Sequence, residues 1–239
     1  MNFLHQVLQW FLTGSHWQGD NGIPHRLGEH VGMSALVVAV ALLLALPVGV
    51  ALGHTGRGGN LAINITNVGR AVPSFGLLVI ALQLVGLGFW PAFIALLALA
   101  IPPMVTNSYV GVREVDPDVR EAARGMGMRP RAVLWRVELP IALPLIMAGI
   151  RTSAVQVVAT ATLAALVAWG GLGRYIVDGL AQRDFVQLFA GAALVAVLSI
   201  LVELGMTGLQ RLAVPAGLRI REPTRRDDTA LQEAALKTA

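Results

Sequence analysis

The chain has 239 residues, of which 55% are hydrophobic and 13% are charged, and its formal net charge at pH 7 is +4. A soluble globule of this size could not bury so much apolar surface, so the composition indicates an integral membrane protein. The chain has no cysteine, which excludes a disulfide framework, and its five histidines lack the spacing of a helical zinc site, so we expect no metal.

Residues 1–30 come first, and we expect them to lie outside the membrane or at its interface. Their apolar stretch at the start of the chain is too short to cross a bilayer and lacks the basic start of a signal peptide. An interfacial helix is the best interpretation of it.

A transmembrane domain is predicted over residues 31–212, because five of its segments each hold about 20 mostly apolar residues. The predicted spans are 31–53, 61–87, 91–112, 140–167 and 186–212. The second span contains Pro73 and is expected to be kinked, and the third contains the pair Pro102–Pro103, which predicts a bend or a break. The fold class is therefore all-α, with about five transmembrane helices.

The basic residues predict the orientation of these spans. The turn after the first span, the insert between spans three and four, and the polar tail (213–239) hold most of the lysines and arginines. The opposite side holds only Arg26, Arg174 and Arg183. The excess of positive charge on cytoplasmic segments predicts an external N-terminus and a C-terminus in the cytoplasm, in a multi-pass protein of the cell membrane.

The insert between spans three and four begins with a helix-start signal. Asp116–Pro117 supplies an N-cap acceptor and a proline at the first helical position, and Gly125 and Gly127 mark the end of a short helix. Small or apolar residues recur on one face of it, namely Val119, Ala122, Ala123 and Met126. Such a face suits docking into a groove on a partner protein, although a basic loop that only sets topology is the plainer alternative. A second short helix is predicted over 131–138, leading into Pro140.

Residues 121–140 read EAARGMGMRPRAVLWRVELP. They match the pattern Glu-Ala-Ala-x3-Gly-x9-Ile-x-Leu-Pro, except that valine replaces isoleucine. The segment therefore resembles the EAA motif of binding-protein-dependent ABC importer permeases of type I. The residues at the motif positions are Glu121, Ala122, Ala123, Gly127, Val137, Leu139 and Pro140. The resemblance implies the methionine-importer-like permease fold, in which these residues form cytoplasmic coupling helices that contact a separate ATP-binding subunit.

The resemblance also implies partners and cofactors. It implies an ATP-binding subunit that holds ATP and Mg²⁺, an extracytoplasmic substrate-binding protein, and a second permease subunit, identical or related; a nucleic-acid partner is not expected. This chain itself is expected to bind no cofactor and to have no ATP site. Its only lysine is Lys237, which is not preceded by the glycine-rich sequence of a P-loop.

Two further segments resemble permeases for quaternary-amine osmoprotectants such as glycine betaine, choline and carnitine. They are LPLIMAGIR (143–151) and AWGGLG (168–173). The second predicts an external loop made by Gly170, Gly171, Leu172 and Gly173, although Ala168 and Trp169 depart from the glycine and alanine of many relatives. Since amino-acid permeases share these motifs in part, a methionine importer is the alternative. A membrane enzyme would need converging catalytic groups, and a passive channel would need no ATP.

Polar residues inside the spans are candidates for the transport pathway. Thr152, Gln156 and Thr160 recur on one face of span four, and Glu203 is the acid placed well within span five. Each is explained equally by pathway lining or by contacts between helices. Aromatic residues gather near the predicted outer ends of the spans. A belt at the membrane interface explains them more simply than a cage for a quaternary ammonium does.

Overall fold

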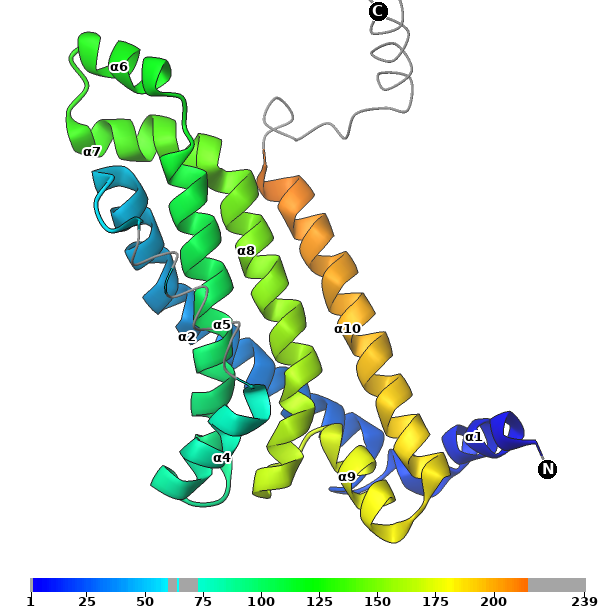
Figure 1. Ribbon diagram of the computed structural model, residues 1–239. Coiled ribbons are helices and arrows are strands. Elements are labelled where there is room, and N and C mark those ends of the chain that lie inside the picture. Colours follow the sequence, from blue (N-terminus) through cyan, green and yellow to red (C-terminus); the bar gives the residue numbers. More distant parts are fainter. Residues whose placement is uncertain (1, 60–63, 65–72, 215–239) are drawn as a thin grey trace, which may run out of the picture.

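The structure is a computed structural model that describes residues 2–59, 64 and 73–214. All regular secondary structure in these residues is helical, in agreement with the predicted fold class. Four long helices run side by side along the molecule, as Figure 1 shows. They are α2 (Ile23–Thr55), α5 (Phe89–Arg113), α8 (Leu139–Thr160) and α10 (Phe185–Ala213).

Each of these four helices, with α8 extended by its neighbouring turns, is long and apolar enough to cross a membrane. α2 begins at Ile23, earlier than the predicted Val31, because Pro24 opens a helix at its first turn and the charged residues that follow continue it. The fourth span ends in a tighter 3₁₀ segment, η3 (Ala161–Val167). The predicted span 61–87 is described only in part: residues 61–63 and 65–72 lie outside the described residues, and α4 (Ser74–Val85) follows Pro73.

Of the bend or break predicted at Pro102–Pro103, the break is absent, since α5 continues through the pair to Arg113. α5 lies between α2 and α8, and this packing on both sides keeps it helical, although the two prolines have no backbone N–H to donate. Small residues bring the three helices close together: a Cβ added to Gly49 of α2 would lie 2.6 Å from the carbonyl oxygen of Val105. On α8, a Cβ added to Gly149 would lie 2.7 Å from the Cβ of Asn107. These glycines therefore permit backbone contact between the spans.

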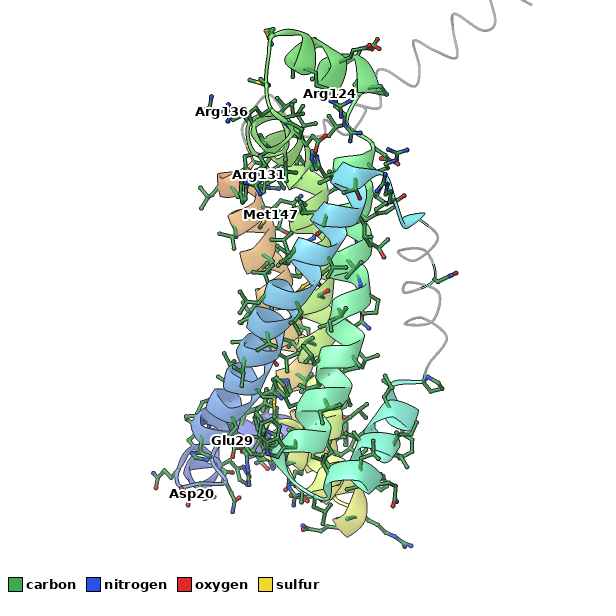
Figure 2. All side chains as sticks on the ribbon, turned by 90° about the vertical axis from the view of Figure 1, so that its left-hand side faces the viewer. Asp20, Glu29, Arg124, Arg131, Arg136 and Met147 are labelled. Carbon is green, nitrogen blue, oxygen red and sulfur yellow. The ribbon has the colours of Figure 1, made fainter. Side chains whose placement is uncertain are left out.

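The two ends of the bundle carry different short helices. At one end lie α6 (Pro117–Gly125) and α7 (Pro130–Val133), followed by a π-helical segment, η2 (Leu134–Glu138), that leads into α8. At the other end lie α1 (Phe3–Leu12), α4 and α9 (Gly173–Gln182). Figure 2 shows Arg124, Arg131 and Arg136 at the first end and Asp20 and Glu29 at the second. The ends are called the α6 end and the α9 end below.

Helix α1 packs against α10 and α9 through aromatic rings. The ring of Phe3 meets Phe189 edge to face at 5.5 Å, and Trp10 meets Tyr175 in the same way at 5.4 Å. Leu4, Leu8 and Leu12 remain exposed along the helix. An amphipathic helix lying across the end of a bundle, with leucines exposed, fits the predicted interfacial position.

Candidate functional site

The first half of the motif forms helix α6, with the predicted start and end. The side chain of Asp116 accepts a hydrogen bond from the backbone N–H of Asp118 at 2.8 Å, which caps the helix, and Pro117 opens it. At the other end, Gly127 has a φ of 83°, and its N–H bonds to the carbonyl of Arg124 at 2.9 Å. A left-handed residue after the last turn is how many helices end, and glycine adopts it without strain.

Only part of the predicted apolar face of α6 is buried. Ala123 is buried at 2% exposure, whereas Val119 is 41% and Met126 is 76% exposed. Glu121 and Ala122 are exposed as well. One side of α6 therefore holds the helix in place, and the other leaves apolar side chains and a carboxylate on the surface, where a partner protein can contact them.

The second half of the motif is helical, as predicted for 131–138, but it is not α-helical throughout. Only Pro130–Val133 is α-helical, and the next turn is the π-helical segment η2, whose following residue, Leu139, donates its N–H to the carbonyl of Leu134. The turn widens next to Pro140, which has no N–H to continue the α-helical pattern. Val137, Leu139 and Pro140 are half-buried, and Leu139 packs against an apolar cluster of α5 and α8.

A buried acidic residue follows Val137, at a position that the motif leaves free. Glu138 is fully buried, and the Nδ1–H of His54 donates to its Oε2 at 2.5 Å. The Nε of Arg120 lies 3.1 Å from its Oε1. Arg120 also donates to the carbonyl of Val112. We call Glu138, Arg120 and His54 the Glu138 junction.

Sequence reasoning missed the Glu138 junction. Glu138 was one of several charged residues in the insert, and its partner His54 is 84 positions away. A weak signal was available, because an acid directly before the apolar start of a span must be paired or exposed. A surface pocket of about 700 Å³ lies beside the junction and is lined by His54, Arg120 and further charged residues of α5 and α6.

The predicted external loop is held against α2. The N–H of Gly171 donates to Oε2 of Glu29 at 2.8 Å, and the N–H of Leu172 donates to Nδ1 of His30 at 3.3 Å. The Nε2–H of His30 donates to the carbonyl of Val158 at 2.9 Å, so the neutral ring bridges the loop and α8. Because these partners are far apart in the sequence, the loop was predicted without its contacts on α2.

Close packing explains the small residues of this loop. Gly171 has a φ of 84°, and a Cβ added to Gly173 would lie 2.2 Å from the carbonyl oxygen of Thr162. A Cβ at Gly170 would overlap the carboxylate of Glu29. After the loop, the hydroxyl of Tyr175 donates to the carbonyl of Asn21 at 2.6 Å, and burial raises the pKa of Tyr175, which keeps the donor protonated.

The polar residues within the spans fall into two groups. Thr152 is exposed and Gln156 and Thr160 are half-buried along α8, and the hydroxyl of Thr160 donates to the carbonyl of Gln156. Glu203 of α10 lies 3.6 Å from the guanidinium of Arg151. The same guanidinium donates to Thr207 at 3.3 Å. Glu203 thus joins α8 to α10, which favours the structural explanation for this residue, whereas the exposed Thr152 stays a candidate for pathway lining.

Aromatic rings near the start of α5, at the α9 end, pack against one another. The ring of Phe89 contacts Trp90 at 5.3 Å, Phe93 at 5.5 Å and Trp169 at 5.2 Å between centroids. These rings fill the space among themselves, an arrangement that favours an interface belt over a cage.

Comparison with known protein families gives one match that covers most of the chain. The family described as "Binding-protein-dependent transport system inner membrane component" matches residues 33–216. The matched region includes the whole of the motif, both of its helices and the loop Gly170–Gly173.

Curated relatives match the chain over most of their own length. It is 34% identical to the choline transport system permease protein OpuBB of Bacillus subtilis (strain 168), over 92% of this chain and 99% of that protein. It is 36% identical to the carnitine transport permease protein OpuCB of Listeria monocytogenes, over 80% of this chain and 88% of that protein. It is 32% identical to the osmoprotectant import permease protein OsmW of Salmonella typhimurium (strain LT2), over 80% and 91%.

Solved structures show the same fold. An inward-facing conformation of the MetNI methionine ABC transporter superposes with a TM-score of 0.66 at 24% identity, over 78% of this chain and 94% of that chain. An amino acid ABC transporter crystallised with histidines superposes with a TM-score of 0.59 at 22% identity, over 89% and 97%. At these identities the likeness concerns the fold alone.

Proposed function

Since this chain belongs to the family of binding-protein-dependent transport system inner membrane components, we propose that it is the membrane-spanning permease subunit of an ATP-driven importer for compatible solutes. The solutes are glycine betaine, choline, carnitine or related quaternary amines. The single observation that carries the proposal is α6: a motif helix, capped at both ends, with its glutamate and apolar side chains exposed. Relatives of 34% and 36% identity with choline and carnitine in their names support the substrate class.

A methionine or other amino-acid substrate is the second candidate. It is favoured by the transporters that share the fold, but these are 22% and 24% identical to this chain. The three curated relatives described above, each over 30% identical, carry choline, carnitine or osmoprotectant in their names, so the amino-acid candidate comes second.

The exposed side of α6 is the proposed contact with the ATP-binding subunit. Glu121, Ala122, Ala123 and Gly127 shape this helix, and Val137, Leu139 and Pro140 lead from it into α8. ATP and Mg²⁺ are held by that partner in this proposal, since the only lysine of this chain is Lys237, outside any P-loop sequence. Closure of the partner moves α6, and the spans follow.

The α9 end is the proposed contact with a substrate-binding protein. The loop Gly170–Gly173 is fixed there by Glu29 and His30, which gives a docking protein a rigid surface. A second permease subunit, identical or related, completes the solute path, with Thr152, Gln156 and Thr160 as its candidate lining. The gathering of arginines at the α6 end supports a cytoplasmic position for that end, with the N-terminus outside the cell and the tail inside.

Co-purification tests the proposal without a choice of substrate. The chain is extracted from its native membrane in mild detergent, and the proteins that accompany it are identified. We expect an ATP-binding subunit, which is lost with Glu121→Arg because the reversed charge meets the partner surface. Glu114→Arg, an equal reversal at an exposed glutamate outside α6, is the matched control and keeps the partner.

Reconstitution of the recovered complex then tests the substrate. Uptake of betaine or choline into proteoliposomes, dependent on ATP and on the binding protein, supports the osmoprotectant assignment. Uptake of methionine alone would replace it with the amino-acid candidate. Solute flow that needs neither ATP nor a partner would instead make the chain a passive channel.

A further inference from the structure

Glu138 is a buried carboxylate that the motif does not explain. It is fully buried, although it lies only two residues before Pro140. Moving a charged group out of water costs on the order of several kcal/mol, unless opposite charges and hydrogen bonds compensate for the lost hydration. The motif leaves this position free, so the residues that pair with Glu138 have to account for it.

Its partners come from two other elements. His54 lies in the last turn of α2 and donates to Oε2 at 2.5 Å, and Arg120 lies in α6 with its Nε 3.1 Å from Oε1. The side chain of Arg120 is 11% exposed, so this ion pair is shielded from water and salt. One carboxylate therefore connects the inner end of α2, the coupling helix α6 and the start of α8.

Arg120 reaches a fourth element as well. Its guanidinium donates to the carbonyl of Val112 and, at 3.4 Å, to that of Arg113, in the last turn of α5. The end of a helix carries partial negative charge on its unpaired carbonyls, which a guanidinium stabilises. The side chain thus binds α5 and Glu138 at the same time.

The rest of α6 is weakly anchored. Ala123 is its one buried residue, and the pocket of about 700 Å³ separates part of α6 from His54 and Arg113. With so little buried apolar surface, α6 is held only weakly by packing. The side chain of Arg120 supplies polar contacts from α6 to Glu138 and to the last turn of α5.

We propose that the Glu138 junction is the joint that transmits movement of α6 to α2, α5 and α8, with Arg120, Glu138 and His54 as positioning residues. The proposal rests on the proposed function, because it assumes that an ATP-binding subunit moves α6. When that subunit closes, α6 carries Arg120 with it, and Glu138 moves together with the start of α8 and the end of α2. Without the joint, the partner hydrolyses ATP while the spans fail to follow.

The test is the number of solute molecules imported per ATP hydrolysed by the complete complex in proteoliposomes. This ratio is independent of how much protein folds, so a merely structural role would leave it unchanged. Glu138→Gln keeps the size of the side chain and removes its charge. We expect it to lower the ratio about tenfold, within the usual range of a coupling free energy between sites. Glu114→Gln, the same change at an exposed position, keeps the native ratio.

A second variant serves if Glu138→Gln fails to assemble. Arg120→Lys keeps a positive charge beside Glu138, but it lacks the planar fork with which the guanidinium faces the carboxylate and the carbonyl of Val112 together. We expect this variant to assemble and to import less solute per ATP, while Arg129→Lys, at an exposed arginine, behaves as the native chain does. If Glu138→Gln imports as much solute per ATP as the native chain, this inference is overturned and the proposed function stands. If Glu138→Gln does not assemble, the same result with Arg120→Lys overturns the inference. Uptake by the native chain that needs no ATP overturns the proposed function and this inference with it.

Discussion

The carboxylate of Glu29 accepts a hydrogen bond from the backbone N–H of Gly171 at 2.8 Å, across 142 positions of sequence. Nη1 of Arg26 donates to the same oxygen, Oε2, at 2.9 Å. The contact fastens the loop after η3 to the first turns of α2, and His30 makes a second such contact, with the N–H of Leu172. The end of the fourth span at the α9 end is therefore fixed by α2, although α5 lies between these two helices over much of their length.

The close packing of the loop predicts the effect of adding one methyl group. Gly173→Ala places a Cβ 2.2 Å from the carbonyl oxygen of Thr162, so backbone has to move. We expect a loss of about 1–3 kcal/mol in stability, as for other overpacked sites. Gly28→Ala, at the same end of the molecule with no atom within 4 Å of the added Cβ, is the control. Thermal unfolding in detergent measures both, and equal midpoints would contradict the prediction.

The end of α6 predicts different results for its two glycines. Gly127→Pro demands a φ near −65°, against the observed 83°, and removes the N–H that bonds to Arg124, so we expect ATP-driven uptake to be lost. Gly127→Ala costs about 1–2 kcal/mol in the left-handed conformation and lowers uptake in part. Gly125→Ala, inside the helix and free of close contacts, keeps native uptake. Native transport by Gly127→Pro would mean that this turn has no part in coupling.

The ion pair between α8 and α10 predicts that exchanging its two charges restores the stability lost when one of them is reversed. Glu203→Arg places a second cation beside Arg151, 3.6 Å from the present carboxylate, and we expect a cost of about 1 kcal/mol because the pair is partly exposed. Arg151→Glu combined with Glu203→Arg restores the pair. The midpoint of thermal unfolding reports the difference. A double variant no more stable than the single one would show that these two residues act independently.

Local chemistry made much of the fold predictable. The Asp116–Pro117 cap and the Gly127 turn depend on residues within a few positions, so the sequence predicts both ends of α6, and the structure confirms them. Long apolar segments likewise predict the helices α2, α5, α8 and α10. The start of α2 at Ile23 was missed because a search for apolar runs stops at charged residues such as Glu29, whose charge is neutralised by Arg26 and by the loop.

The contacts that complete the candidate site depend on distant residues. No pattern near Glu138 indicates that His54 will pair with it, and none near Gly171 indicates Glu29. The continuity of α5 depends on distant residues in the same way: a proline pair within one helix indicates a break, whereas α2 and α8 pack on both sides of α5, which stays helical through Pro102–Pro103. The coupling role of the motif residues and the lining role of Thr152 stay predictions.

The π-helical segment Leu134–Glu138 amounts to one residue more than an α-helical turn requires. Each residue of an α-helix turns the chain by about 100°, so everything after the segment is rotated by that angle relative to an unbroken helix from Pro130. That phase slip lets Trp135 remain 69% exposed while Glu138, three positions later, is fully buried. A homologue with a single-residue deletion here would retain both flanking helices, yet its acid would face a different direction, so insertions and deletions in this short segment should be under stronger selection than substitutions.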